Sequence, residues 1–263
     1  MTAALSRSAP PPLAPITATL DAMRARHGDA PVVGFVPGPV TDLDGWTSAG
    51  DLVRGDGVSA LLEAAQQRWQ AQPHAAAALA WKCYTYWLAL PAVLGYATAR
   101  RVPLMHPDNV VVRYATHQPF LMVGLRRLEM AVRADDPIAA SDLPGIRVVP
   151  DDAALRAALR YSLVDRHLAP LMERVREHVH LGRRTLWGSL ASGVSHGLSR
   201  ASDALPGSTL ETAHTLLTAL DVDELVELTA LPSGALRVQR RTCCLAFTLP
   251  VPKVCAGCCI RGL

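Results

Sequence analysis

The stretch AAAALAWKCYTYWLALPAVLGYATA, residues 75–99, sets the fold, because a segment this long and apolar must either cross a membrane or be buried in a protein core. Lys82 and Thr85 interrupt its first half, and Pro91 lies inside it. A buried core helix explains this pattern better than a lone membrane anchor in mid-chain. We therefore expect a central helix here and no stable membrane insertion. Its apolar positions recur near helical spacing at Leu79, Cys83, Trp87, Leu90 and Leu94.

The segments around this helix are also mostly helical. Asp151 and Asp152 begin one of them, and carboxylates suit the positive end of a helix dipole. Pro170 should kink or split that helix. Ser208 and Glu211 have the spacing of a capping box. Apolar periodicity and these signals together predict helices at residues 58–72, 75–99, 151–180, 186–199 and 208–217.

Short strands interrupt the helical pattern. Runs of β-branched and apolar residues predict strands at residues 109–115 and 120–125, with a third at 146–149. The chain turns β-like again after residues 231–234 and stays so through Phe247. The expected fold class is therefore mainly α with a small β element (α+β).

The expected organisation is a helical body followed by a short cysteine-rich tail. Residues 1–55 form a leader and an unassigned N-terminal segment, residues 56–234 the mainly helical body, and residues 235–263 the tail. Pro232-Ser233-Gly234 reads as the linker before the tail. Within the body, a neighbouring element should pack closely against the small residues Gly188, Ser189, Ser192 and Gly193.

The composition excludes several classes of protein. Of the 263 residues, 50% are hydrophobic and only 19% are charged, which excludes a disordered chain. The net charge is +3, and the arginines form no stripe interleaved with aromatic residues, so nucleic acid is not an expected partner. The opening MTAALSRSAPPPLAP lacks the apolar core of a signal peptide. We expect a cytoplasmic protein, whose thiols stay reduced.

Five of the six cysteines lie between Cys243 and Cys259. Four of them, Cys243, Cys244, Cys255 and Cys258, form the pattern C-C-x10-C-x2-C. Soft thiolates select zinc, copper(I) or iron–sulfur clusters. Four thiolates can complete either a tetrahedral zinc site or a [2Fe–2S] rhomb. The sixth cysteine, Cys83, stands alone in the apolar helix and is expected to be a packed core residue.

The adjacent pair Cys243-Cys244 bears on which metal is bound. Successive side chains of a regular strand point to opposite faces, so the backbone must turn or bulge there if both thiols bind one centre. Zinc sites normally use C-x2–4-C spacing at both ends, and the bare pair argues mildly against zinc. A disulfide framework is disfavoured in the cytosol. Zinc stays open as an alternative.

The motif resembles the tail of the FhuF-like ferric-siderophore reductases. Upstream, WKCYTYWLALPAVLGY at residues 81–96 resembles that family's aromatic-rich helix. RHLAPLMERV at 166–175 and RRTLWGSLASGV at 183–194 resemble its central segments. The resemblance covers the chain from about Trp69 onward.

This resemblance implies an oxidoreductase that holds a [2Fe–2S] cluster on Cys243, Cys244, Cys255 and Cys258. It also implies one-electron reduction of iron(III) chelated by a hydroxamate-type siderophore, with release of iron(II). The sequence departs from the family after the last ligand, where Cys259 replaces a common proline. This extra thiol could compete as a ligand. In the loop before Cys255, Pro250-Val251-Pro252 stand where the family often has glycines.

No G-x-G-x-x-G follows a strand, so the electron is expected from an external donor. Arg240 and Arg241 could raise the cluster potential or help to dock an acidic donor protein, and the alternative is that they are two solvated strand residues. His106, His117 and Arg113 could line a chelate pocket, although a surface or structural role is favoured for each. The rival functions are a non-catalytic zinc- or Fe–S-binding module and an iron–sulfur redox sensor.

Overall fold

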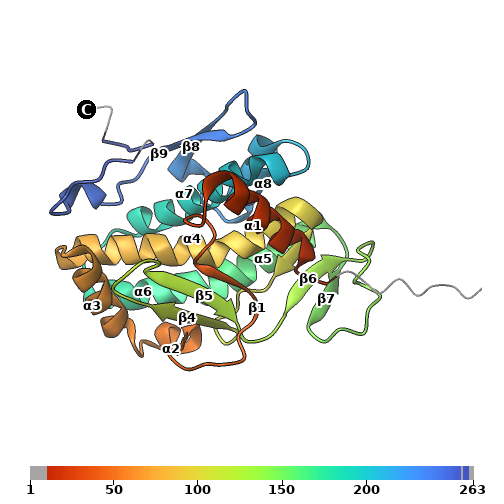
Figure 1. Ribbon diagram of the computed structural model, residues 1–263, viewed down its shortest axis with the longest axis horizontal. Helices are drawn as coiled ribbons and strands as arrows, with labels where there is room; N and C mark the ends of the chain where they lie inside the picture. The colour runs from red at the N-terminus through yellow and green to blue at the C-terminus, as the bar shows by residue number, and fades with distance from the viewer. Residues whose placement is uncertain (1–10, 256, 261–263) are drawn as a thin grey trace, which may run out of the picture.

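The computed structural model describes residues 11–255 and 257–260, and the helix α4, Pro73–Ala99, runs through its centre (Figure 1). Pro73 stands in the first turn, where its missing N–H has no helical partner to lose. Arg100 ends the helix in the left-handed region, with φ 53°. Nearly all of the helix is buried, Pro91 included. The expected core helix is thus confirmed, and within the described residues no helix is long and apolar enough to span a bilayer.

The helix α7, Arg183–Ala201, lies along α4 (Figure 1). A Cβ added at Gly193 of α7 would lie only 3.3 Å from Cα of Tyr86 in α4. The indole N–H of Trp81 in α4 donates a hydrogen bond to the Leu186 carbonyl of α7 at 2.9 Å. The close packing predicted for the small residues of this segment is therefore confirmed.

A four-stranded sheet in the order β1–β5–β4–β2 lies on the other side of α4 (Figure 1). A second sheet has the order β3–β6–β7. The strands predicted at residues 109–115, 120–125 and 146–149 are present as β4, β5 and β7. The others were not predicted, because they are short and their apolar pattern is weak. The strands of these sheets are β1, Phe35–Pro39; β2, Thr47–Ser48; β3, Arg101–Pro103; β4, Val110–Tyr114; β5, Leu121–Leu125; β6, Met130–Arg133; and β7, Ile146–Val149.

The N-terminal segment that sequence reasoning leaves unassigned is part of the main core. The helix α1, Ala14–His27, buries Ile16, Leu20 and Met23 in the core that also contains α4. The strand β1 pairs in parallel with β5. The predicted leader falls largely on residues 1–10, outside the described residues. Between β2 and α4 the chain forms α2, Ala49–Arg54, and α3, Val58–Trp69.

The predicted helix at residues 151–180 is divided, as expected from Pro170. The helix α5, Asp152–Arg160, leads into a π-helical segment, Tyr161–Leu168, and then into α6, Ala169–His178. Pro170 has no N–H to bond four residues back, so the regular ladder cannot continue through it. It stands instead in the first turn of α6.

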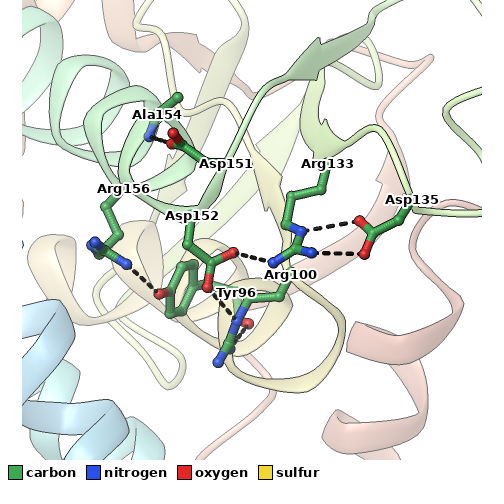
Figure 2. Close-up of polar contacts among 8 residues, drawn as sticks. All are labelled: Tyr96, Arg100, Arg133, Asp135, Asp151, Asp152, Ala154 and Arg156. Carbon is green, nitrogen blue, oxygen red and sulfur yellow. Dashed lines mark hydrogen bonds and ion pairs between the residues drawn. The ribbon is translucent and has the colours of Figure 1, made fainter.

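Charged contacts tie the start of α5 to α4 and β6 (Figure 2). The Asp151 carboxylate caps α5 by accepting a hydrogen bond from the Ala154 N–H at 2.8 Å. Asp152 pairs with Arg133 of β6 at 3.0 Å and with Arg100 at the end of α4 at 3.3 Å. The two aspartates thus confirm the predicted helix start.

The region after α7 forms two short 3-10 turns, the helix α8 and a β-hairpin. Ser208 caps α8 by accepting a hydrogen bond from the Glu211 N–H at 3.2 Å, as the capping box predicts. Pro232-Ser233-Gly234, expected as a linker, form the turn of the hairpin, where Gly234 has φ 78°. The elements are the turns Ser202–Ala204 and Asp223–Leu225, α8, Thr209–Ala219, and the strands β8, Val226–Ala230, and β9, Leu236–Arg240.

The expectation of β-structure through Phe247 is wrong. The strand β9 ends at Arg240, and the chain then turns inward so that Thr242 packs against Gly188 of α7. A 3-10 turn, Ala246–Thr248, follows. Because this inward turn comes directly before the cysteine pair, it determines how those two thiols are presented.

Candidate metal centre

Cys243 and Cys244 lie in irregular backbone just beyond β9. Leu245 follows them in the left-handed region, with φ 60°, and reverses the chain. The Leu245 N–H points back to the Cys243 sulfur at 3.3 Å. A turn of this kind is what two adjacent cysteines need in order to face one centre.

The second half of the motif packs directly on β9. The Cys258 N–H donates to the Cys255 carbonyl at 3.1 Å, which closes the short loop between them. The Arg240 N–H donates to the Gly257 carbonyl at 2.9 Å, so the loop continues the hydrogen bonding of the strand. A Cβ at Gly257 would overlap the Val238 carbonyl oxygen. Glycine is therefore required here for a close approach.

The clustered thiols make pairwise contacts, and all of them are free. The Cys255 thiol donates a hydrogen bond to the Cys244 sulfur, which lowers the pKa of Cys244 to about 5 and raises that of Cys255. Cys243 forms a second hydrogen bond with Cys259, whose pKa is raised mainly by burial. Within the described residues, no three Cys, His, Asp or Glu side chains are placed to hold one metal ion. The thiols thus gather as pairs, with Cys258 buried beside them.

Arg240 is the buried cation of this region. Only 2% of the residue is exposed, and within the described part of the chain none of its three guanidinium nitrogens has a hydrogen-bond partner. The nearby Thr242 hydroxyl is likewise buried and unpartnered there. Arg241, by contrast, is exposed and pairs with Glu227 at 3.8 Å. Of the two arginines, only Arg241 is a solvated residue.

A buried and unpaired guanidinium is costly, so a group of opposite charge must neutralise it. The pKa of Cys244 is lowered chiefly by the hydrogen bond from Cys255, and Arg240 adds a smaller coulombic contribution in the same direction. Thiolates bound to a metal or an iron–sulfur cluster keep a net negative charge. The donor atoms and the orphaned cation together therefore fit a metal–thiolate centre.

A cavity of about 590 Å³ adjoins the thiols, with Cys255 in its wall. Its other walls come from α3, α4, α7 and the residues before β5. Cys83 also reaches it, and burial raises the pKa of this lone thiol to about 11, so it stays protonated. Sequence reasoning did not locate this cavity. The one feature of the sequence that indicated it was Lys82, a charged residue inside the apolar helix. The remaining polar and aromatic lining residues are Arg68, Trp69, Lys82, Tyr86, Trp87, Gln118, Phe120, Ser192, His196 and Arg200.

Arg113 and His117 line a second cavity, of about 450 Å³. The two cavities share Pro119, but no cysteine is among the residues of the second. The residues that the sequence suggested for a chelate pocket thus lie outside the cavity beside the thiols.

Comparison with known proteins identifies a family model that matches this chain. The family model described as "Ferric iron reductase FhuF-like transporter" matches residues 79–223, more than half of the chain. The match begins in α4 and ends before β8, so it covers α7 and Lys82 but not the clustered cysteines. The search of curated proteins found no match.

Proposed function

Because the chain belongs to the FhuF-like ferric iron reductase family, we propose that it is a cytoplasmic enzyme that reduces iron(III) held by a hydroxamate-type siderophore. In this proposal a [2Fe–2S] cluster is bound by Cys243, Cys244, Cys255 and Cys258. An external protein or small-molecule donor supplies the electron. The chelate binds beside Cys255.

The observation that carries the proposal is the position of Cys255, which belongs to both the thiol cluster and the cavity wall. A chelate in the cavity would lie against one of the ligands of the centre. Electron transfer would then need neither a mobile domain nor a second cofactor. The cavity's volume of about 590 Å³ lies within the range typical of small-molecule sites.

The arrangement of the thiols supports the cluster over zinc. Each iron of a [2Fe–2S] rhomb takes two thiolates, whereas a structural zinc ion needs four donors around one point. Cys244 with Cys255 is one pair. Cys243 contacts Cys259, and Cys259 in turn lies near Cys258. The charge of Arg240 supports either centre, because a zinc–tetrathiolate site is also anionic. The pairing is therefore the feature that favours the cluster.

The chain's own residues prepare the site for one-electron chemistry. The cluster, when bound, supplies a single electron at a time. Arg240 and Lys82 stabilise the ionised form of Cys244, and the Leu245 N–H hydrogen-bonds the Cys243 sulfur. Hydroxamate oxygens are hard donors that hold iron(III) far better than iron(II). One added electron therefore weakens the iron–oxygen bonds, and the iron leaves as iron(II).

Anaerobic single-turnover mixing tests the proposal. Chemically reduced wild-type protein is mixed with a ferric tris-hydroxamate in the presence of an iron(II) indicator. We expect the visible absorption of the oxidised cluster to return as iron(II) appears, in equal amounts. Cys244→Ser should lose both signals, and Cys83→Ser should keep the visible absorption of the cluster, since Cys83 is outside the motif. A reduced cluster that stays reduced in the presence of the chelate would refute the function.

A further inference from the structure

The cavity beside Cys255 carries positive charge that no acidic residue balances. Arg68, Lys82 and Arg200 line it, and no Asp or Glu is among its lining residues. Within the described residues, none of these three cations forms an ion pair with a carboxylate. Arginines elsewhere do, as Arg101 does with Asp136 at 2.7 Å.

The contacts of these cations leave hydrogen-bonding groups and positive charge available to a ligand. The Nε of Arg68 is buried, and among the described residues it has no hydrogen-bond partner. Arg200 donates to the Tyr86 hydroxyl at 3.1 Å and lies over the Tyr86 ring, 5.6 Å from its centroid. Lys82 lines the same cavity as the Cys255 thiol. Positive charge is therefore present both at the walls of the cavity and near the thiols.

The rest of the lining adds flat apolar faces and one neutral imidazole. The rings of Trp69 and Phe120 pack at 4.6 Å between centroids, and Trp87 also reaches the cavity. Burial, assisted by Arg200 and Lys82, lowers the pKa of His196 to about 4. His196 can thus hydrogen-bond a ligand, but it carries no charge at neutral pH.

We infer that this cavity selects a ferric chelate with a net negative charge, which Arg68, Lys82 and Arg200 bind. This inference rests on the proposed reductase function and narrows its substrate. A tris-hydroxamate complex of iron(III) is neutral, because three singly charged ligands balance the metal. A hydroxamate chelate that also bears ionised carboxylates is anionic, and so is a tris-catecholate chelate. Net negative charge is the property that the cavity recognises in both.

The same cations favour the reduction itself. One electron converts the bound iron(III) to iron(II), and the chelate becomes more negative by one charge. Nearby positive charge stabilises the more anionic product over the reactant. The cations would therefore bind the substrate and also make its iron easier to reduce.

Binding of gallium(III) chelates tests the inference without any redox step, because gallium(III) has the charge and coordination chemistry of iron(III) but is not reduced under these conditions. Calorimetric titration of the cluster-loaded protein compares three chelates: a neutral tris-hydroxamate, a citrate-based dihydroxamate and a tris-catecholate. We expect both anionic chelates to bind at least tenfold more tightly than the neutral one. The comparison between the two anionic chelates identifies the ligand class.

Variants that remove one positive charge show which residues cause the tighter binding of the anionic chelates. Arg68→Gln and Arg200→Gln should each weaken binding of the anionic chelates about tenfold, the range expected for loss of one charge-assisted hydrogen bond. Neither variant should change binding of the neutral chelate. Arg126→Gln is the matched control, because Arg126 is exposed and lies outside the cavity lining. It should bind all three chelates as the wild type does.

Equal affinity for neutral and anionic chelates would overturn the inference, and so would wild-type binding by both cavity variants. If none of the three chelates binds, the inference is overturned as well. Failure of this inference can be distinguished from failure of the proposed reductase function. Gallium binding without iron(III) reduction would contradict the proposed activity alone, whereas reduction without a charge preference would contradict only the inference.

Discussion

At the scale of single residues, the burial of Arg240 is the strongest constraint on the thiol centre. If Arg240 were a solvated strand residue, it would have the same surroundings as its neighbour Arg241. The structure separates the two, because Arg240 is 2% exposed and Arg241 pairs with Glu227 at the surface. Their different surroundings predict different effects on a cluster.

Arg240→Gln should lower the reduction potential of the cluster, because it removes a buried positive charge that stabilises the reduced, more negative state. The expected shift is on the order of 50 mV. Spectroelectrochemical titration measures it, on samples matched for iron content. Arg241→Gln should leave the potential nearly unchanged, since solvent screens that charge. Equal shifts in the two variants would show that Arg240 does not act on the centre.

His167 is a second informative residue, in the π-helical segment and away from the thiols. It is fully buried, with Nδ1 2.7 Å from the Met105 carbonyl and Nε2 2.7 Å from the Tyr84 hydroxyl. A carbonyl only accepts, so Nδ1 carries the proton and Nε2 accepts from Tyr84. Burial lowers the pKa of His167 from 6.5 to about 4. The ring is therefore neutral in the folded protein.

This shift predicts a loss of stability in mild acid. The unfolded chain binds the proton more tightly than the folded one, so stability is complete above about pH 6.5 and falls as the pH drops toward 4. Near pH 5 His167 alone should have cost the folded state about 2 kcal/mol of stability relative to pH 7.5. Denaturant unfolding of His167→Gln should lack this component, whereas the exposed His178→Gln control should retain it. The same pH profile in His167→Gln and in the wild type would contradict the assignment.

At the scale of elements, the tail depends on how tightly the C-x2-C loop fits against β9. A Cβ at Gly257 would meet the Val238 carbonyl, so Gly257→Ala must push the loop and its two thiols away from the strand. We expect this variant to lose most of its cluster while the protein keeps its melting temperature within a few degrees.

Gly182→Ala provides the comparison. Gly182 precedes α7 with an ordinary φ of −67°, and an added Cβ would lie 4.0 Å from its nearest neighbour. It should keep the wild-type cluster content. Iron analysis and thermal unfolding of the two variants measure both effects. Full cluster loading in Gly257→Ala would show that the loop is not held by this close approach.

Elements also differ in how well the sequence predicts them. The helices α4 and α7 and the start of α5 have local signals, namely a long apolar run, small residues at helical spacing and capping aspartates. The strands β3 and β6 have few such signals, since their pairing is set by partners distant in the chain. The extension of β9 to Phe247 failed for a related reason: the inward turn at Thr242 is favoured by Gly188, which lies in another element.

At the scale of the whole molecule, the sequence likewise predicts some features of the candidate centre and not others. Residue type and spacing in one short segment predict four thiol ligands, and this assignment stays a prediction. The cavity could not be predicted, because its walls are far apart in sequence and meet only when α4 packs between α3 and α7. The burial of Arg240 could not be predicted either, because it depends on the tail folding back over β9.

An iron and sulfide determination on protein purified without oxygen, together with its visible spectrum, tests whether the clustered cysteines hold an iron–sulfur cluster. We expect about two irons and two sulfides per chain and charge-transfer bands in the visible range. We also expect that Cys244→Ser loses both while Cys83→Ser retains both. A colourless protein that carries one zinc ion and no sulfide would contradict the account and remove the basis for electron transfer.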